Sequence, residues 1–221
     1  MYIIMLGGPG SGKGSVGGRL SEDLNLPHVA TGDIFRAELK NETVLGKKIK
    51  KYMDNGLLVP DEVVIEVVES RLSNEDVKNG VILDGFPRTK DQAVALDNFL
   101  SEKGKKVDAA IELDVSDDDI VKRIVKRVVC SNKSCGESFN TEFKPSKVAG
   151  ICDKCGSSLI KRSDDNEETV MQRLKVYHET SKELLEYYKN TGVLFTIHPN
   201  IYSETVLEDN VSEVKKYLKN K

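Results

Sequence analysis

The sequence predicts an α/β fold in which a parallel β-sheet is covered by helices on both faces. Short apolar runs alternate with helical stretches along the 221 residues, which is the order expected of repeated βα units. The runs are mostly apolar rather than alternating with polar residues, as is typical of strands buried on both faces. The first run, residues 2–6, leads into a glycine-rich turn and then into a helical stretch.

The elements follow from these patterns in chain order. Strands are expected at residues 2–6, 28–29, 81–83, 109–113 and 193–197, and helices at 14–24, 33–40, 45–55, 61–73, 90–101, 117–128, 167–189 and 204–218. In the first helix Gly17 and Gly18 are unusual, because an interior glycine costs about 1 kcal/mol relative to alanine. The strand at 81–83 runs into Asp84. Because parallel sheets bind ligands at the carboxyl ends of their strands, Asp84 is a candidate site residue.

Residues 7–14 read Gly-Gly-Pro-Gly-Ser-Gly-Lys-Gly, which contains the Gly-x4-Gly-Lys spacing of a phosphate-binding loop. Small residues let consecutive backbone N–H groups turn toward phosphate oxygens, and the next helix adds its positive N-terminal end. With the ammonium group of Lys13, the motif predicts a nucleoside polyphosphate ligand. Gly14 stands where most such loops have a hydroxyl that binds Mg²⁺, and Ser15 is the nearest hydroxyl. We therefore expect phosphates, water and a carboxylate to hold Mg²⁺.

The composition predicts a soluble protein whose anion sites are built locally. Charged residues make up 31% of the chain, and the net charge is −3. The overall charge therefore does not indicate nucleic acid or an anionic membrane as a partner. No stretch approaches the roughly 20 apolar residues of a membrane span. Met1 leads straight into the first expected strand without a basic leader segment, so we expect a cytoplasmic location.

The four cysteines of the chain lie within one short segment. They are Cys130, Cys135, Cys152 and Cys155. Two pairs with this spacing favour a tetrahedral, four-thiolate zinc site with no open position for catalysis. Two disulfides, or four unrelated buried thiols, are the alternatives. The spacing of the first pair is Cys-x4-Cys, so the knuckle at residues 131–134 is expected to be loose.

The segment around the cysteines differs in composition from the rest of the chain. Between residues 127 and 162 the pattern changes to Gly, Lys, Ser and Cys. This change indicates a small inserted domain that a metal stabilises, because its own core is too small. A zinc ribbon that binds nucleic acid is the alternative interpretation of this segment.

Arg123 and Arg127 lie four residues apart within the helix expected at 117–128. At that spacing both guanidinium groups can point to one side and hold phosphates. Lys122 and Lys126 beside them suit a solvated basic face equally well. The spacing alone leaves both interpretations open.

Four motifs together resemble the adenylate kinases, a family of nucleoside monophosphate kinases. They are the loop at residues 7–15, Thr31-Gly32-Asp33, Asp84-Gly85-Phe86-Pro87-Arg88, and Arg162-Ser163-Asp164-Asp165. They occur in family order and spacing over the whole chain, and the long four-cysteine insertion is similar to that of zinc-bearing bacterial members. The resemblance implies a monomer that transfers a phosphoryl group reversibly from MgATP to AMP, giving two ADP.

The family fold implies a five-stranded parallel core with two mobile insertions. The core would comprise residues 1–29, 60–126 and 163–221, the AMP-binding domain residues 30–59, and the lid residues 127–162. The cofactors implied are Mg²⁺, which accompanies ATP, and a structural Zn²⁺ on the four cysteines.

The resemblance also assigns roles to matching residues. Those that would bind ATP are Gly10, Ser11, Gly12, Lys13, Gly14, Ser15, Arg123, Arg127, Ser138, Phe139 and Ile201. Those that would bind AMP are Thr31, Arg36, Leu57, Leu58, Val59, Gly85, Phe86, Pro87, Arg88, Gln92, Arg162 and Arg173. The catalytic set would be Lys13, Asp84, Arg88, Arg123, Arg162 and Arg173, with Asp84 fixing the water shell of Mg²⁺.

The resemblance also makes Asp164 and Asp165 carboxylates that orient lid arginines, and three of the assignments have structural alternatives. Gln92 could be a helix surface residue, and Asp164 and Asp165 could cap the helix expected at 167 instead of, or as well as, orienting lid arginines. The match at Ile201 is weak, because Pro199 restricts the loop before it and lacks an N–H group.

The implied reaction needs no general base, because the attacking phosphate oxygen is already ionised. Catalysis then rests on positioning and charge neutralisation by arginine and lysine, without a histidine–carboxylate pair. The three histidines, His28, His178 and His198, lie in no cluster that looks catalytic in the sequence, and we expect structural roles for them.

Three alternative functions remain. A kinase for another nucleoside monophosphate would keep the fold, although Thr31, Gln92 and the long insertion favour AMP. A P-loop GTPase switch lacks support, because residues 132–135 break the Asn-Lys-x-Asp guanine motif at the last position. A zinc-dependent nucleic-acid module is opposed by the net charge and by the absence of a basic stripe with interleaved aromatic residues.

Overall fold

A five-stranded parallel sheet forms the centre of the described chain in this computed structural model, which describes residues 1–132, 135–203 and 205–221. The strands are β1 (Tyr2–Gly7), β2 (His28–Ala30), β3 (Val81–Asp84), β4 (Ala109–Leu113) and β8 (Leu194–Ile197), in the order β2-β3-β1-β4-β8. Each neighbouring pair is parallel. The expected fold class and all five expected strands are confirmed.

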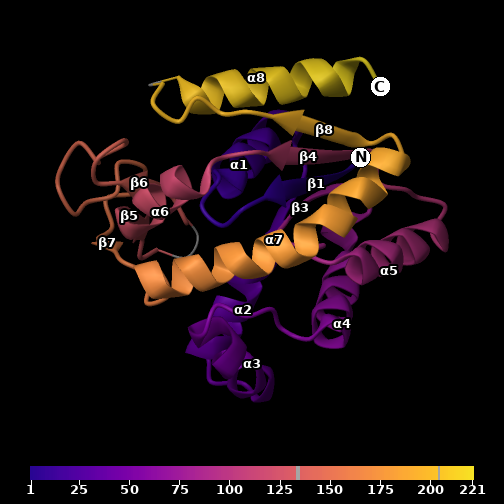
Figure 1. Cartoon of the computed structure of the whole chain (residues 1–221), viewed down its shortest axis with the longest axis horizontal. Coiled ribbons are helices and arrows are strands. Elements are labelled where there is room, and N and C mark those ends of the chain that lie inside the picture. Colours follow the sequence, from indigo (N-terminus) through magenta and orange to yellow (C-terminus); the bar gives the residue numbers. More distant parts are fainter. Residues whose placement is uncertain (133–134, 204) are drawn as a thin grey trace.

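Helices cover both faces of the sheet (Figure 1). They are α1 (Lys13–Leu24), α2 (Thr31–Lys40), α3 (Val44–Asp54), α4 (Asp61–Leu72), α5 (Lys90–Ser101), α6 (Asp117–Val125), α7 (Glu167–Asn190) and α8 (Val206–Lys219), with a 3-10 turn at Glu75–Val77. The start expected for the last helix, residue 204, lies outside the described residues. None of the described helices is both long and apolar enough to cross a membrane.

The two faces of the sheet build separate cores, because side chains of a strand alternate between its faces. In β1, Ile3 and Met5 pack with residues of α1 and α8. Tyr2, Ile4 and Leu6 pack instead with residues of α4, α5 and α7. Burial of apolar residues on both faces explains why the strand sequences lack polar alternation.

One predicted helix is too long. The helix expected at 117–128 ends at Val125, and the chain enters β5 (Arg127–Cys130). β5 pairs with β6 (Ser138–Asn140) and β7 (Leu159–Ile160) in a separate antiparallel sheet of order β6-β5-β7. Pairing with segments that are distant in sequence outweighs the local helical pattern here, so Arg127 does not share a helix with Arg123.

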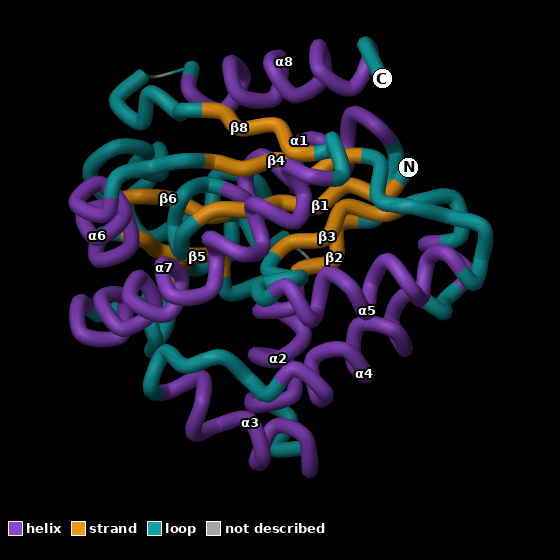
Figure 2. Tube along the Cα trace, turned by 45° about the vertical axis from the view of Figure 1, so that its right-hand side comes forward, coloured by secondary structure: helices purple, strands orange, loops and turns teal. Residues whose placement is uncertain are grey.

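Two segments project from the central sheet, one at the bottom in Figure 2 and the other at the left in Figure 1. One holds α2 and α3, which follow β2 and precede α4 in the sequence and pack on each other. The other, residues 127–162, holds β5, β6 and β7, and we refer to it as the four-cysteine segment. Its buried cluster consists of Cys130, Phe139 and Cys152. Such a small core is consistent with the expectation that this segment needs a further source of stability.

Candidate active site

The loop between β1 and α1 wraps around its own lysine. Lys13 Nζ donates hydrogen bonds to the carbonyl oxygens of Gly7 and Gly8, both at 2.7 Å. Burial lowers the pKa of Lys13 to about 8, although the charge of Asp84 opposes that shift. Gly10 has φ 75°, and a Cβ there would lie 2.5 Å from Ile124 Cγ1. The loop geometry therefore requires glycine and places a cation at the carboxyl end of β1.

Ser11 adds an unused polar group to this loop. Its side chain is buried, and its Oγ has no hydrogen-bond partner. A buried hydroxyl without a partner is costly unless a ligand satisfies it. Ser11 therefore fits a loop that receives a hydrogen-bonding ligand such as phosphate.

Asp84 faces the loop from the end of β3, the strand next to β1. Burial by itself would raise the pKa of Asp84, but the adjacent His28 imidazole and the charges of Lys13 and Arg88 outweigh it and lower that pKa. A Cβ at Gly14 would lie 3.3 Å from Asp84 Oδ2. A larger residue at position 14 would therefore crowd the carboxylate, which gives a physical reason for glycine where other loops carry a hydroxyl.

One histidine lies in this site, contrary to the sequence interpretation. His28 Nε2 is 3.7 Å from Asp84 Oδ2. The two residues are far apart in sequence, and only the pairing of β2 with β3 brings them together. His178 and His198 instead lie near the protein surface, each with a ring nitrogen close to a carboxylate oxygen, of Asp117 at 2.9 Å and of Asp114 at 3.2 Å.

The arginines expected to hold phosphates lie close enough together to shift one another's pKa, and Arg88 and Arg127 also act on Lys13 of the loop. Burial and the charges of Arg173 and Arg36 lower the pKa of Arg88. Burial and the charges of Arg36 and Arg127 lower the pKa of Arg162 to about 10. Such mutual repulsion in a partly buried site is relieved by anions, so the cluster fits a ligand with several negative charges.

Arg123 and Arg127 reach the same region from different elements. Arg123, in α6, donates to the carbonyl oxygen of Ser11 over 3.4 Å. Arg127, at the start of β5, donates to Asp165 through Nε and Nη2 at 2.8 and 2.5 Å. The charge of Arg127 adds to burial in lowering the pKa of Arg123. The interpretation as a solvated basic face is wrong for Arg123, because this half-buried residue directs its guanidinium to the loop carbonyl of Ser11.

Asp164 and Asp165 are partners of arginines, and neither caps α7. Asp164 accepts a hydrogen bond from Arg173 and lies 3.9 Å from Arg36. The helix cap is Asn166, whose side chain accepts from the N–H of Thr169 at 2.9 Å. The capping interpretation of the two aspartates is therefore wrong.

Gln92 is buried, so the surface interpretation of this residue is wrong. Its Oε1 accepts from the N–H of Arg88 at 2.8 Å, and its Nε2 donates to Asp61 Oδ1 at 2.8 Å. Thr31 Oγ1 donates to the carbonyl oxygen of Gly85 at 2.9 Å. Both side chains therefore support the loop at residues 85–88, which includes the cis peptide between Phe86 and Pro87.

The other residues assigned by resemblance lie around this centre or in the two projecting segments. Leu57 is exposed and Val59 is buried just before α4. Ser138 lies in β6. Phe139 packs its side chain into the four-cysteine segment rather than toward the loop. Ile201 is buried in the turn that follows β8.

The four cysteines converge in space. Their Sγ atoms all lie within 4.8 Å of one another, and each cysteine is a free thiol. The disulfide alternative and the alternative of unrelated thiols therefore do not describe this structure. Four thiolates at this separation can hold one tetrahedral metal ion. Part of the knuckle between Cys130 and Cys135, residues 133–134, lies outside the described residues.

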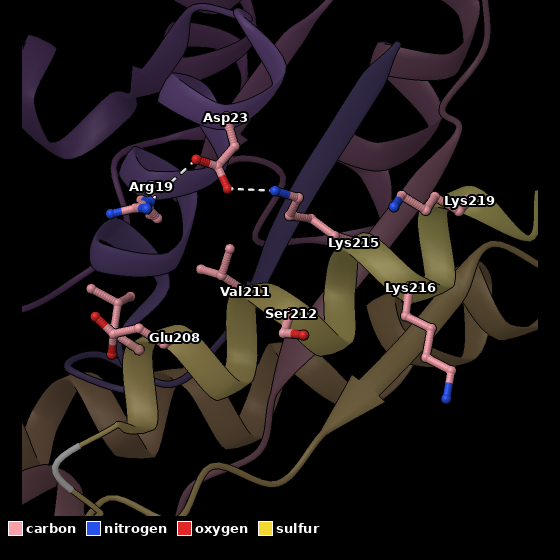
Figure 3. Close-up of a pocket in the computed structure, with 9 residues that line it drawn as sticks. Arg19, Asp23, Glu208, Val211, Ser212, Lys215, Lys216 and Lys219 are labelled. Atoms are coloured by element: carbon pink, nitrogen blue, oxygen red, sulfur yellow. Dashed lines mark hydrogen bonds and ion pairs between the residues drawn. The ribbon is translucent and has the colours of Figure 1, made fainter.

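A groove of about 380 Å³ lies between α1 and α8 (Figure 3). Asp23 accepts from Arg19 Nε at 3.2 Å and from Lys215 Nζ at 2.7 Å, and the apolar side chains of Leu207 and Val211 also line the groove. None of the residues assigned by resemblance lines this groove. Because its aspartate is already bonded to two cations, we assign the groove no part in the reaction.

Comparison with known proteins agrees with this geometry. The sequence model of the family described as adenylate kinase matches residues 5–193. The adenylate kinase of Caldicellulosiruptor bescii is 50% identical over 218 residues, covering 99% of both chains. That of Ruminiclostridium cellulolyticum is 53% identical over 194 residues, covering 88% of this chain and 90% of the relative. The adenylate kinase of Clostridium tetani is 49% identical over 214 residues, covering 97% and 98%. The chain therefore belongs to the adenylate kinase family.

Proposed function

We propose that this enzyme transfers the terminal phosphoryl group of MgATP reversibly to AMP, giving two ADP. The observation that carries the proposal is a connected cluster of seven cations that begins at the loop after β1. They are Lys13, Arg36, Arg88, Arg123, Arg127, Arg162 and Arg173, linked by their mutual charge effects. The triphosphate of ATP and the monophosphate of AMP, meeting end to end, would neutralise this charge.

The chemistry follows from those charges. The attacking oxygen of the AMP phosphate is ionised, so no residue has to remove a proton. Lys13 would hold the β- and γ-phosphates of ATP, with Arg123 and Arg127 on the same nucleotide. Arg36 and Arg88 would hold the AMP phosphate, and Arg162 and Arg173 the group in transfer. Charge that spreads over the transferring oxygens then meets donors that are already in place.

Asp84 fits the cofactor that this chemistry needs. Mg²⁺ prefers oxygen ligands and keeps several waters. A half-buried carboxylate with a lowered pKa beside Lys13 suits an ordered water shell. When bound with ATP, Mg²⁺ neutralises charge on the phosphates. Asp84 would orient that shell, while Gly14 leaves the space that the carboxylate occupies.

We assign the two projecting segments to substrate binding and closure. Residues 30–59 would bind AMP, and residues 127–162 would act as the lid over ATP, with residues 1–29, 60–126 and 163–221 as the core. Arg162 approaches Asp33 of α2 at 3.9 Å, and Arg36 of α2 approaches Asp164 at 3.9 Å. The first pair joins the proposed lid to the AMP-binding segment and the second joins that segment to the core, so both would favour closure, which keeps water from accepting the phosphoryl group.

We assign the cysteine cluster to a structural Zn²⁺. Four protein ligands would fill a tetrahedral coordination sphere and leave no open position for catalysis. We also propose that the enzyme works in the cytoplasm as a monomer, with ATP, AMP and ADP as its small-molecule partners and no role in nucleic-acid or membrane binding.

The first experiment mixes purified protein and MgATP with AMP, CMP, UMP or GMP, and follows ADP by a coupled assay. Rapid ADP formation with AMP alone supports the proposal. Turnover only with another acceptor would keep the family and overturn the assignment of AMP. No turnover with any of the four would overturn the proposed reaction.

A further inference from the structure

His28 lies beside the proposed magnesium carboxylate although the family chemistry does not require a histidine. β2 and β3 are parallel, with His28 opposite Ile82 and Ala30 opposite Asp84. Ile82 and Asp84 are two residues apart and so share a face of the sheet. His28 lies on that same face, which α1 covers, and this placement brings the imidazole diagonally next to Asp84.

The imidazole of His28 and the carboxylate of Asp84 are close but do not form a hydrogen bond. His28 Nε2 is buried and has no hydrogen-bond partner. Its nearest acidic atom is Asp84 Oδ2 at 3.7 Å, just beyond hydrogen-bond length. A buried polar atom without a partner costs free energy. A small shift of Asp84 or of the imidazole would form the bond.

Helix α1, which packs over this face of the sheet, leaves room for the imidazole ring. A Cβ at Gly17 would lie 2.9 Å from His28 Nε2 and 3.2 Å from its Cδ2, whereas a Cβ at Gly18 would meet nothing within 4 Å. The two adjacent glycines of α1 therefore have different surroundings, and only Gly17 contacts the imidazole. Gly17 makes room for the imidazole, which explains why a residue unfavourable in helices stands at this position.

We propose that His28 is a positioning residue that holds Asp84 in the orientation required when the magnesium nucleotide binds. The imidazole N–H donates to Asp84 Oδ2 as the site fills, limits rotation of the carboxylate, and so orders the water shell that Asp84 faces. Gly17 keeps the ring within reach. This inference rests on the proposed function, because it assigns Asp84 to magnesium.

The test compares His28→Leu, which removes the donor, with His28→Gln, which keeps an N–H group on a side chain of similar reach. We expect His28→Leu to lower kcat about 3- to 10-fold, the effect of losing one hydrogen bond, and to raise the Mg²⁺ concentration needed for half-maximal rate. His28→Gln should restore most of both. The KM for AMP should not change, because the AMP-binding residues remain in place.

A binding measurement separates this role from general packing. Calorimetric titration with ATP in EDTA should give the same Kd for wild type and His28→Leu, while titration with ATP and Mn²⁺ should show weaker binding by the variant. Equal losses in EDTA and with Mn²⁺, or no loss in either, would overturn the proposal. Failure of wild type in the acceptor panel would instead overturn the proposed function.

A second pair of variants covers the case in which His28→Leu does not fold. Gly17→Ala places a methyl group against the imidazole, and Gly18→Ala is its matched control in the same helix. We expect Gly17→Ala alone to raise the Mg²⁺ requirement, with both variants folded by circular dichroism. Equal Mg²⁺ requirements in the two folded variants would contradict the positioning role.

Discussion

Lys154 Nζ donates to Glu22 Oε1 at 3.2 Å, and so joins the four-cysteine segment to α1 across 132 residues of sequence. Lys154 lies between Cys152 and Cys155, so the pair attaches the proposed zinc site directly to the core. The hydrogen bond and charge of Glu22 raise the pKa of Lys154. Both side chains are more than half exposed, and such pairs are worth about 0–1 kcal/mol and weaken with salt.

Loss of this pair should loosen the proposed lid slightly. We expect Lys154→Gln and Glu22→Gln each to raise the KM for ATP by about 1.5- to 5-fold at low salt, with little effect at high salt. The double variant should match the single ones, because one interaction is removed in each. Lys161→Gln, at another exposed lysine of the segment, is the control. Additive effects in the double variant would show that the pair is not coupled.

ATP binding should weaken in alkaline solution because of Lys13. Its pKa of about 8 in the free enzyme means that the ammonium is lost as pH rises through 8, whereas bound phosphates favour the charged form. We expect the Kd for ATP to rise roughly 10-fold per pH unit well above pH 8. Calorimetry between pH 7.5 and 9.5 measures this effect. Lys13→Met should bind weakly and with little pH dependence, and a flat profile for wild type would refute the assignment.

The pair of Arg127 with Asp165 should matter for folding. Asp165 is fully buried, so Asp165→Asn leaves the Arg127 charge without its carboxylate. We expect the free energy of unfolding to fall by about 3 kcal/mol, as when one partner of a buried pair is removed. Asp33→Asn is the control, because Asp33 is 66% exposed and should cost under about 1 kcal/mol. Urea unfolding monitored by circular dichroism compares the two, and equal losses would show that burial of Asp165 does not decide the effect.

Removal of the metal should lower the thermal stability of the protein more than its catalytic activity. Chelation, or Cys152→Ser, should release one zinc per chain by mass spectrometry of the metal content and lower the melting temperature by several degrees. The physical reason is that residues 127–162 bury very little apolar surface of their own. Activity well below the new melting temperature should persist in part. Complete loss of activity in protein that stays folded would mean that the metal serves the reaction directly.

Much of the fold follows from local patterns in the sequence. The five strands were predictable because runs such as residues 2–6 are apolar on both faces. Several helix starts were predicted to within a residue or two, and in the structure Thr89, Ser116 and Asn166 cap three of these helices with a side-chain oxygen. The end of α6 was missed, because β5 forms only where β6 and β7 supply its hydrogen bonds.

The candidate site divides in the same way. The sequence by itself determined the phosphate loop and the cysteine cluster, because residue type and short spacing specify their chemistry, whereas the arginines were assigned by the family resemblance. Tertiary structure alone decided that His28 meets Asp84, that Gln92 is buried against Asp61, and that Asp165 pairs with Arg127. Each of these pairs joins residues from different elements. Strand register and helix packing set such distances, and no pattern of neighbouring residues encodes them.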